Sequence, residues 1–252
     1  FNYDDCFQLL RNPGLSVDEK NLETFDDERM KAFLDAVDGD AEELERTSIL
    51  GIDPPDHTRL RRLVSKAFTP RTIEALRPRI QELVDDALDR IAEQGQADVI
   101  AELAFPLPFD VISEMLGMPA GDTEALRAWS EDIVKTIDPI ITEDEIKAAV
   151  VANRLMDQYM AGVIEWKREN PADDLLTAMI EAEEDGDKMS SKELSDQVNL
   201  LFIAGHETTV NLIGTGIADL LSRPDQAQSI RDNGLEMNGV DELLRFVSPV
   251  QM

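Results

Sequence analysis

One long segment of helical periodicity, over residues 191–222, constrains the fold more than any other feature of this sequence. Ser190 or Ser191 can cap its start, and Glu193 falls in the first turn, which is typical of a capping box. The segment ends before Pro224, because the residue that precedes a proline avoids the helical region. We therefore expect the longest helix of the chain here.

The rest of the sequence is also helical in its pattern, with apolar residues recurring at intervals of three and four. The clearest case is 72–93, which Gly95 is expected to stop. Further helices are expected at 109–117, 122–136, 143–168, 174–184, 224–232 and 238–247. Strand signals are sparse, with 97–100 the best candidate, and 12–52 is expected to be mainly loop. Because strands and helices do not alternate as in a parallel sheet, the chain is predicted to be mostly α with minor β content.

Charge limits the partners that this chain can have. Its 252 residues include 53 Asp and Glu but only 24 Lys and Arg, for a formal net charge of −29. Binding to nucleic acid or to an anionic membrane needs clustered Lys and Arg, so neither is expected. The longest uninterrupted apolar run, 200–204, is far shorter than a membrane span. The one cysteine, Cys6, excludes an internal disulfide framework and suits a reducing compartment, so we expect a cytoplasmic protein.

A polar cluster interrupts the long helix at 204–209, which reads Ala-Gly-His-Glu-Thr-Thr between apolar flanks. A helix that is apolar all round is buried, and buried polar groups are costly unless they are hydrogen-bonded or used. Thr208 can bond back to the carbonyl of Ala204 and, beside Gly205, open a small groove next to Ala204. Glu207 lies on a different face of the helix from Ala204 and Thr208, and it could relay protons. The alternative is a buried helix whose polar side chains cap nearby backbone.

Basic residues stand out in a second segment, 53–62, which reads Asp-Pro-Pro-Asp-His-Thr-Arg-Leu-Arg-Arg. The prolines and acids are a plausible helix start. His57 and Arg61 lie one turn apart at the edge of the apolar stripe, where they could hold an anionic group of a buried ligand. Three basic side chains lie on the opposite, solvent-facing side: Arg59, Arg62 and Lys66. The alternative is an ordinary amphipathic helix with a solvated basic face.

A third pattern, Glu242 and Arg245, lies just before Ser248 and Pro249. Glu and Arg three residues apart on a helix commonly form a surface ion pair. Alone, this pattern indicates little about function.

Together and in this order, the three segments resemble a cytochrome P-450 of the soluble bacterial type. The 204–209 segment matches the oxygen-activating stretch of that family's central helix I, and 54–61 matches its helix C. The 242–245 segment matches the Glu-x-x-Arg of helix K, and 9–13 looks like the end of helix B. The resemblance covers essentially the whole chain, 1–252, as a single domain that runs approximately from helix B through helix K.

The resemblance implies a mostly α P-450 fold with haem b between helix I and a cysteine loop. It implies a monooxygenase that inserts one atom of O2 into a small hydrophobic organic substrate. By the same resemblance, Glu207 and Thr208 would deliver protons, and Ala204 and Gly205 would line the oxygen groove.

The resemblance also implies roles for the basic residues. His57 and Arg61 would hold the haem propionates. Glu242 and Arg245 would belong to a structural ion pair that braces the haem-binding core. A ferredoxin-type electron donor would dock on the face that carries three basic side chains, Arg59, Arg62 and Lys66.

One departure concerns the iron ligand. The family binds iron through a cysteine in a Phe-x-x-Gly-x-x-x-Cys loop downstream of helix K, and no such loop lies within residues 1–252. Cys6 lies near the start of the chain, whereas the ligand loop follows helix K. A helix is expected over residues 3 to 10, where Cys6 would be a small half-buried hydrophobe. We therefore expect no metal ligand in this chain, a thiolate from beyond Met252, and a fragment that lacks the N-terminal start.

Two alternatives remain open from the sequence. The chain could be a non-catalytic helical binding or partner domain that retains the scaffold without the haem-ligand loop. An unrelated acidic helical binding domain is a further alternative, although it leaves the order of the three segments unexplained.

Overall fold

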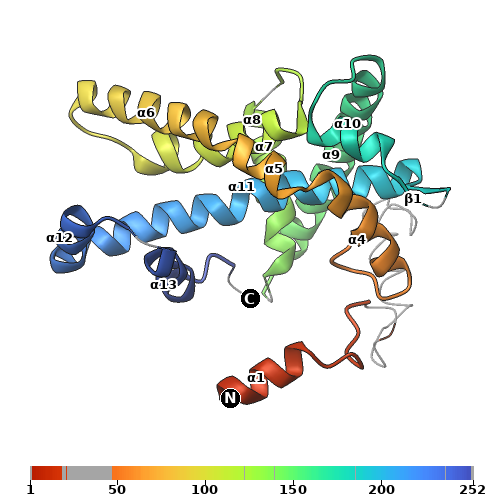
Figure 1. The fold of residues 1–252 in the computed structure, drawn as a ribbon, viewed down its shortest axis with the longest axis horizontal. Helices are drawn as coiled ribbons and strands as arrows, with labels where there is room; N and C mark the ends of the chain where they lie inside the picture. Colours follow the sequence, from red (N-terminus) through yellow and green to blue (C-terminus); the bar gives the residue numbers. More distant parts are fainter. Residues whose placement is uncertain are drawn as a thin grey trace.

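The computed structural model describes residues 2–18, 21, 47–121, 123–138, 140–184, 186–235 and 237–250. These residues are mostly helical, as predicted (Figure 1). The α-helices are α1 (Tyr3–Leu10), α4 (Asp56–Ala67), α5 (Pro70–Ala75), α6 (Arg77–Gln94), α7 (Pro106–Leu116), α8 (Thr123–Val134), α9 (Glu143–Glu169), α10 (Leu175–Glu181), α11 (Ser191–Leu221), α12 (Pro224–Asn233) and α13 (Met237–Val247). A π-helical turn spans Ile100–Ala104 and a 3-10 turn spans Lys135–Ile137. Two strands, β1 (Glu183–Glu184) and β2 (Asp187–Lys188), form an antiparallel hairpin.

Helix α11 runs across the whole molecule (Figure 1), and its predicted limits are confirmed to within one residue. The Oγ of Ser190 accepts a hydrogen bond of 3.2 Å from the Glu193 amide, and the Glu193 carboxylate accepts one of 2.7 Å from the Ser190 amide. This capping box satisfies two amides that a helix start leaves without partners. The sequence prediction of a local start signal is therefore confirmed.

The hydrophobic core surrounds the N-terminal half of α11. Helices α4, α7, α9 and α10 contribute side chains to it, and each fully buried apolar side chain stabilises the fold by about 1.5–3 kcal/mol. Members that are almost wholly buried include Leu116, Met156, Met160, Leu175, Leu176, Val198 and Phe202. The apolar flanks of the 204–209 segment were expected to be buried, but the second flank, 210–213, is only half-buried, with Asn211 exposed. In the C-terminal half of α11, Gly214 lies against Ile100 and Gly216 lies near Leu243.

Two sequence predictions are wrong in the segment between α4 and α7. The expected 72–93 helix is divided into α5 and α6, because Pro78 has no amide hydrogen to continue the first helix. The expected strand at 97–100 is absent. The Asp98 carboxylate instead accepts the amides of Ile100 and Ala101, at 3.0 and 3.1 Å, and so starts the π-helical turn. Gly95 does stop α6, in a left-handed conformation with φ 72°.

The remaining differences lie near the ends of elements. The expected 174–184 helix ends at Glu181, and the β1–β2 hairpin follows it.

Helix α1 stands apart from the other helices and buries none of its residues (Figure 1). Cys6 was expected to be half-buried, but its thiol is free and exposed. Most of the 12–52 segment, expected to be loop, lies outside the described residues. No helix in the described part of the chain is long and apolar enough to cross a membrane.

Candidate functional site

The polar cluster of α11 presents a hydroxyl and a carboxyl group on a half-buried side of the helix. The Thr208 hydroxyl donates to the carbonyl oxygen of Ala204 at 3.0 Å, which confirms the predicted bond across one helical turn. Because this bond uses the hydroxyl hydrogen, the lone pairs of the oxygen remain available as acceptors. Ala204 itself is exposed. Thr209 makes the equivalent bond to Gly205, at 3.3 Å, on a neighbouring side of the helix.

Gly205 faces helix α7. A Cβ atom placed there would lie 2.9 Å from both the Cδ1 and Cγ1 of Ile112, closer than side chains normally approach. The absence of a side chain at Gly205 therefore lets α7 pack closely against α11. This is a packing role that the sequence pattern did not indicate, and the lining of a groove by Gly205 stays a prediction.

Glu207 lies beside a buried histidine that sequence reasoning left without a role. The side chain of Glu207 is 17% exposed, and its Oε1 lies 3.3 Å from Nε2 of His206, which is completely buried. The Nδ1 of His206 lies 2.7 Å from the carbonyl oxygen of Phe202, one turn earlier. A histidine four residues after a buried aromatic residue, beside a carboxylate, was the one signal in the sequence for this arrangement.

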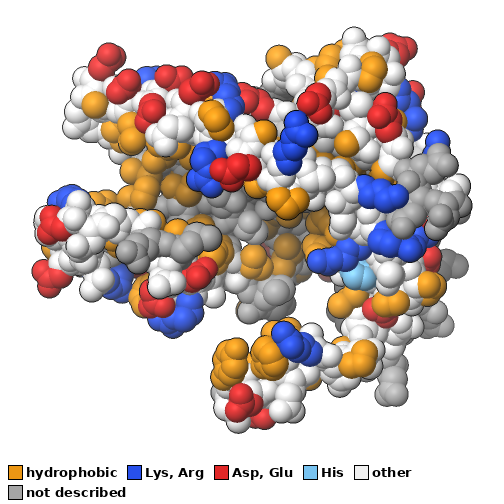
Figure 2. Space-filling view, viewed as in Figure 1, with side chains coloured by type: hydrophobic (Ala, Val, Ile, Leu, Met, Phe, Trp, Pro, Cys, Tyr) orange, Lys and Arg blue, Asp and Glu red, His pale blue; other side chains and the backbone are white. Residues whose placement is uncertain are grey.

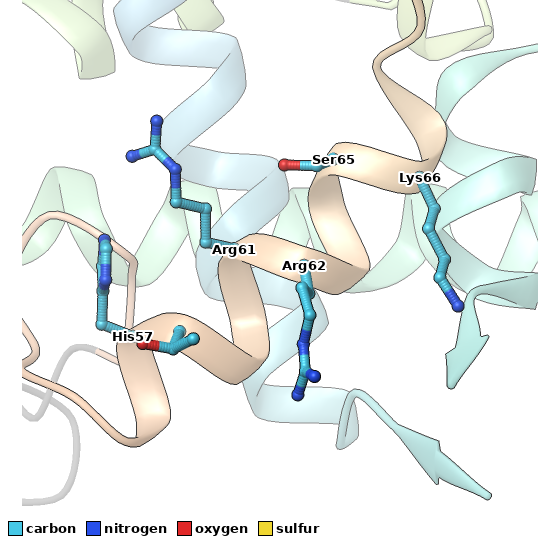
Figure 3. Close-up of a pocket in the computed structure, with 6 residues that line it drawn as sticks. His57, Arg61, Arg62, Ser65 and Lys66 are labelled. Carbon is cyan, nitrogen blue, oxygen red and sulfur yellow. The ribbon is translucent and has the colours of Figure 1, made fainter. Parts of the chain in front are cut away.

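Helix α4 carries the basic side chains, and Lys and Arg gather over it on the molecular surface (Figure 2). Six of its residues line an open pocket of about 480 Å³: His57, Thr58, Arg61, Arg62, Ser65 and Lys66. His57 and Arg61 point to one side of the helix, whereas Arg62 and Lys66 point to the other (Figure 3). His57 and Arg61 therefore share one side of α4 and Arg62 and Lys66 share another, although all four line the same pocket.

Arg59 does not belong to the exposed basic group, contrary to the sequence prediction. Its guanidinium is 25% exposed and forms ion pairs with Glu193 of α11 and with Asp187 of β2, the latter at 3.5 Å. Burial alone would lower the pKa of Arg59, but hydrogen bonding to Glu193 and the charge of that carboxylate raise it above its ordinary value. The cause of the error is tertiary: the start of α11 covers the side of α4 on which Arg59 lies.

Glu242 and Arg245 form the predicted ion pair on α13. The two guanidinium contacts, Nε to Oε2 and Nη2 to Oε1, both measure 2.7 Å. Hydrogen bonding to Arg245 lowers the pKa of Glu242 below its ordinary value. The side chains are 60% and 68% exposed, so the pair lies at the surface of the described residues. A larger bracing role for the pair stays a prediction.

Residues of this chain fit part of a haem site and not its iron ligand. Two donor side chains on one side of α4 suit a pair of carboxylates, and Ala204 on α11 is exposed. The thiol of Cys6 is exposed on α1, which stands away from α11 (Figure 1). Among the described residues, no three His, Cys, Asp or Glu side chains are grouped to hold a metal ion.

Comparisons with known proteins agree with this geometry. The profile of the family described as Cytochrome P450 matches residues 27–243. Cytochrome P450 107B1 of Saccharopolyspora erythraea is 43% identical over 98% of this chain and 59% of its own length. The monooxygenase PikC of Streptomyces venezuelae is 40% identical over 99% of this chain and 56% of its own length.

A solved structure shows the same fold. The myxobacterial cytochrome P450 CYP267B1 superposes with a TM-score of 0.83 and is 38% identical, over 97% of this chain and 59% of that one. The chain thus spans about three fifths of the length of the relatives that it matches. With helices in the same arrangement and the family pattern along most of its length, this chain belongs to the cytochrome P450 family.

Proposed function

We propose that the protein of which this chain is part is a haem-dependent monooxygenase that inserts one atom of O2 into an organic substrate. Family membership supports this proposal. The observation that carries it is the polar cluster of α11, where the Thr208 hydroxyl bonds to exposed Ala204 and a partly exposed carboxyl, Glu207, adjoins it in the sequence.

Haem b is the proposed cofactor, and it supplies the iron at which O2 binds and is reduced. His57 and Arg61 would hold its propionates, because both donate hydrogen bonds and point to the same side of α4 (Figure 3). The thiolate ligand would come from a cysteine other than Cys6.

Glu207 and Thr208 would move protons toward the exposed side of α11. The Thr208 oxygen, fixed by its bond to the Ala204 carbonyl, can accept a hydrogen bond there. The carboxyl of Glu207 is partly exposed and can exchange a proton with water. Proton transfer by a positioned side chain commonly contributes about 10²–10⁴ in rate.

A small hydrophobic molecule is the proposed substrate class. Hydrophobic side chains line the hollow beside α11 and below α6 (Figure 2). The solved structure of CYP267B1 holds myristic acid, and that of CYP109E1 holds corticosterone. Both are largely apolar molecules, which supports the class without naming the substrate of this protein.

The proposed electron donor is an acidic protein of the ferredoxin type. The net charge of −29 makes most of the surface repel such a donor, whereas Arg62 and Lys66 place two exposed basic side chains on α4. Exposed charges of this kind mainly raise the rate of association. The docking face proposed here therefore consists of Arg62 and Lys66, without Arg59.

The test of the proposed function uses the full-length protein. Its reduced, carbon monoxide-bound form is expected to show the Soret band of a thiolate ligand, and Cys6→Ala is expected to retain that band. Turnover with isotopically labelled O2 is expected to place one labelled atom in the product. A full-length protein that takes up no haem would instead indicate the non-catalytic helical domain.

A further inference from the structure

His206 is a titratable group in an apolar environment that the proposed function does not use. Its ring lies among three phenyl rings, with centroid distances of 6.2 Å to Phe105, 5.7 Å to Phe109 and 5.0 Å to Phe202. The side chain has no exposed surface. A buried imidazole is costly unless its nitrogens have partners, so the surroundings of each nitrogen decide what this residue can do.

The Nδ1 atom of His206 carries a hydrogen. Its partner at 2.7 Å is the carbonyl oxygen of Phe202, and a carbonyl oxygen can only accept. When the imidazole is neutral, its lone pair is therefore on Nε2. This bond also sets the orientation of the ring, because it joins the side chain to its own helix one turn earlier.

The Nε2 atom faces the carboxyl of Glu207 and no other polar group of the described residues. The distance from Nε2 to Oε1 is 3.3 Å, yet the two atoms are not aligned as a hydrogen bond, and Nε2 is a buried nitrogen without a partner. Consecutive residues on a helix normally point away from each other. A lone pair and a carboxylate would repel each other at this distance, so a proton between them is needed for attraction.

We propose that His206 is a positioning residue for Glu207, and that Nε2 and Oε1 share one mobile proton. The pair alternates between imidazolium with carboxylate and imidazole with carboxylic acid. Passing from the first form to the second breaks the N–H bond at Nε2 and forms an O–H bond at Oε1. Transfer of the proton from Oε1 to a water molecule breaks that O–H bond, forms an O–H bond on the water and leaves a neutral imidazole and a carboxylate, with nothing oxidised or reduced.

Burial limits the route by which this proton can leave or reach His206. His206 has no exposed atom, whereas Glu207 is 17% exposed, so a proton on Nε2 can leave or return only through Glu207. Use of this proton in turnover rests on the proposed function, but sharing of the proton between the two side chains does not.

Three substitutions separate this role from simple core packing. His206→Phe fills the space with a fourth apolar ring and removes both nitrogens. His206→Asn retains a donor near Nδ1 and removes Nε2, and His206→Gln places an amide near Nε2 that can orient Glu207 without carrying its proton. If His206 positions Glu207, the fraction of consumed oxygen that appears in product falls several-fold in His206→Phe and His206→Asn. In His206→Gln that fraction falls less, because the amide still orients Glu207. Wild-type coupling in His206→Phe would overturn the role.

A second measurement does not depend on activity. Histidine labelled with nitrogen-15 is followed by NMR in the full-length protein, in its reduced, carbon monoxide-bound and diamagnetic state, and His206→Phe identifies the His206 signals. We expect a protonated Nδ1 and an Nε2 shift that moves in Glu207→Gln but not in Glu242→Gln, a control at an exposed carboxyl group. The same Nε2 shift in wild type and Glu207→Gln would overturn the proposal, whether or not the protein proves to be a monooxygenase.

Discussion

The guanidinium of Arg59 on α4 is hydrogen-bonded to the carboxylate of Glu193 in the first turn of α11. The same carboxylate accepts the Ser190 amide at 2.7 Å, so one side chain both starts α11 and holds α4 against it. Helix α4 carries His57 and Arg61, and α11 carries Glu207 and Thr208. This contact therefore links the helices that carry the two halves of the candidate site.

Arg59→Met is expected to lower the free energy of unfolding by about 1.5–3 kcal/mol, the value of a hydrogen bond to a charged group. Urea unfolding of the full-length protein measures it. Arg77→Met is the matched control, because Arg77 pairs with Glu74 at 2.7 Å with side chains that are 76% and 67% exposed. Exposed pairs contribute about 0–1 kcal/mol. Equal losses in the two variants would show that burial of Arg59 adds nothing.

The contribution of the Arg59–Glu193 pair is expected to depend on pH. Burial raises the pKa of Glu193, but hydrogen bonds from Ser190 and Arg59 outweigh it and hold the pKa below the ordinary value of 4.5. A lowered pKa means that folding favours the ionised group, so the contribution is complete above pH 4.5 and is lost as the pH falls through the lowered pKa. Unfolding curves across this range are expected to show wild type and Arg59→Met converging in acid.

Thr208→Ala is expected to retain haem and substrate binding while releasing peroxide in place of product. The reason is that the Thr208 oxygen is an acceptor on the exposed side of α11 beside Ala204. Thr209→Ala is the control, since it loses the equivalent bond to Gly205 without changing that side. The ratio of peroxide to product measures the effect. Normal coupling in Thr208→Ala would contradict the proton-delivery role.

Reversal of charge at Arg62 and Lys66, both to Glu, is expected to slow the first electron transfer several-fold at low ionic strength. The difference is expected to shrink as salt is added, because salt screens exposed charges over about 10 Å at 0.1 M. Stopped-flow reduction by an acidic ferredoxin measures the rate. The control reverses Arg90 on α6 and Arg231 on α12, at the other end of the fold from α4 (Figure 1). Equal slowing in both pairs would indicate a general charge effect.

Gly117→Ala is expected to destabilise the protein by about 3–5 kcal/mol, because it would separate a buried ion pair. A Cβ atom at Gly117 would lie 2.2 Å from Oδ2 of Asp174 and 2.6 Å from Nζ of Lys167, two atoms that are themselves 2.6 Å apart. Gly95→Ala is the control, with a similar φ of 72° but no atom within 4 Å. Backbone strain alone costs about 1–2 kcal/mol. Thermal unfolding compares the two variants.

The sequence by itself determined the features that depend on residues within one or two helical turns. The limits of α11 follow from its capping box and from Pro224, and Gly95 ends α6. The Thr208 bond to Ala204 and the Glu242–Arg245 pair also join residues at most four positions apart. Such contacts form wherever the helix forms, so periodicity and spacing are sufficient to predict them.

Only the tertiary structure decided what lies against each side of a helix. A helical projection places Arg59 with Arg62 and Lys66, yet the start of α11, far along the chain, covers Arg59 and pairs it with Glu193. Likewise, the close approach of Ile112 gives Gly205 its packing role. Both outcomes depend on contacts between residues distant in sequence, which the period of a single helix does not encode.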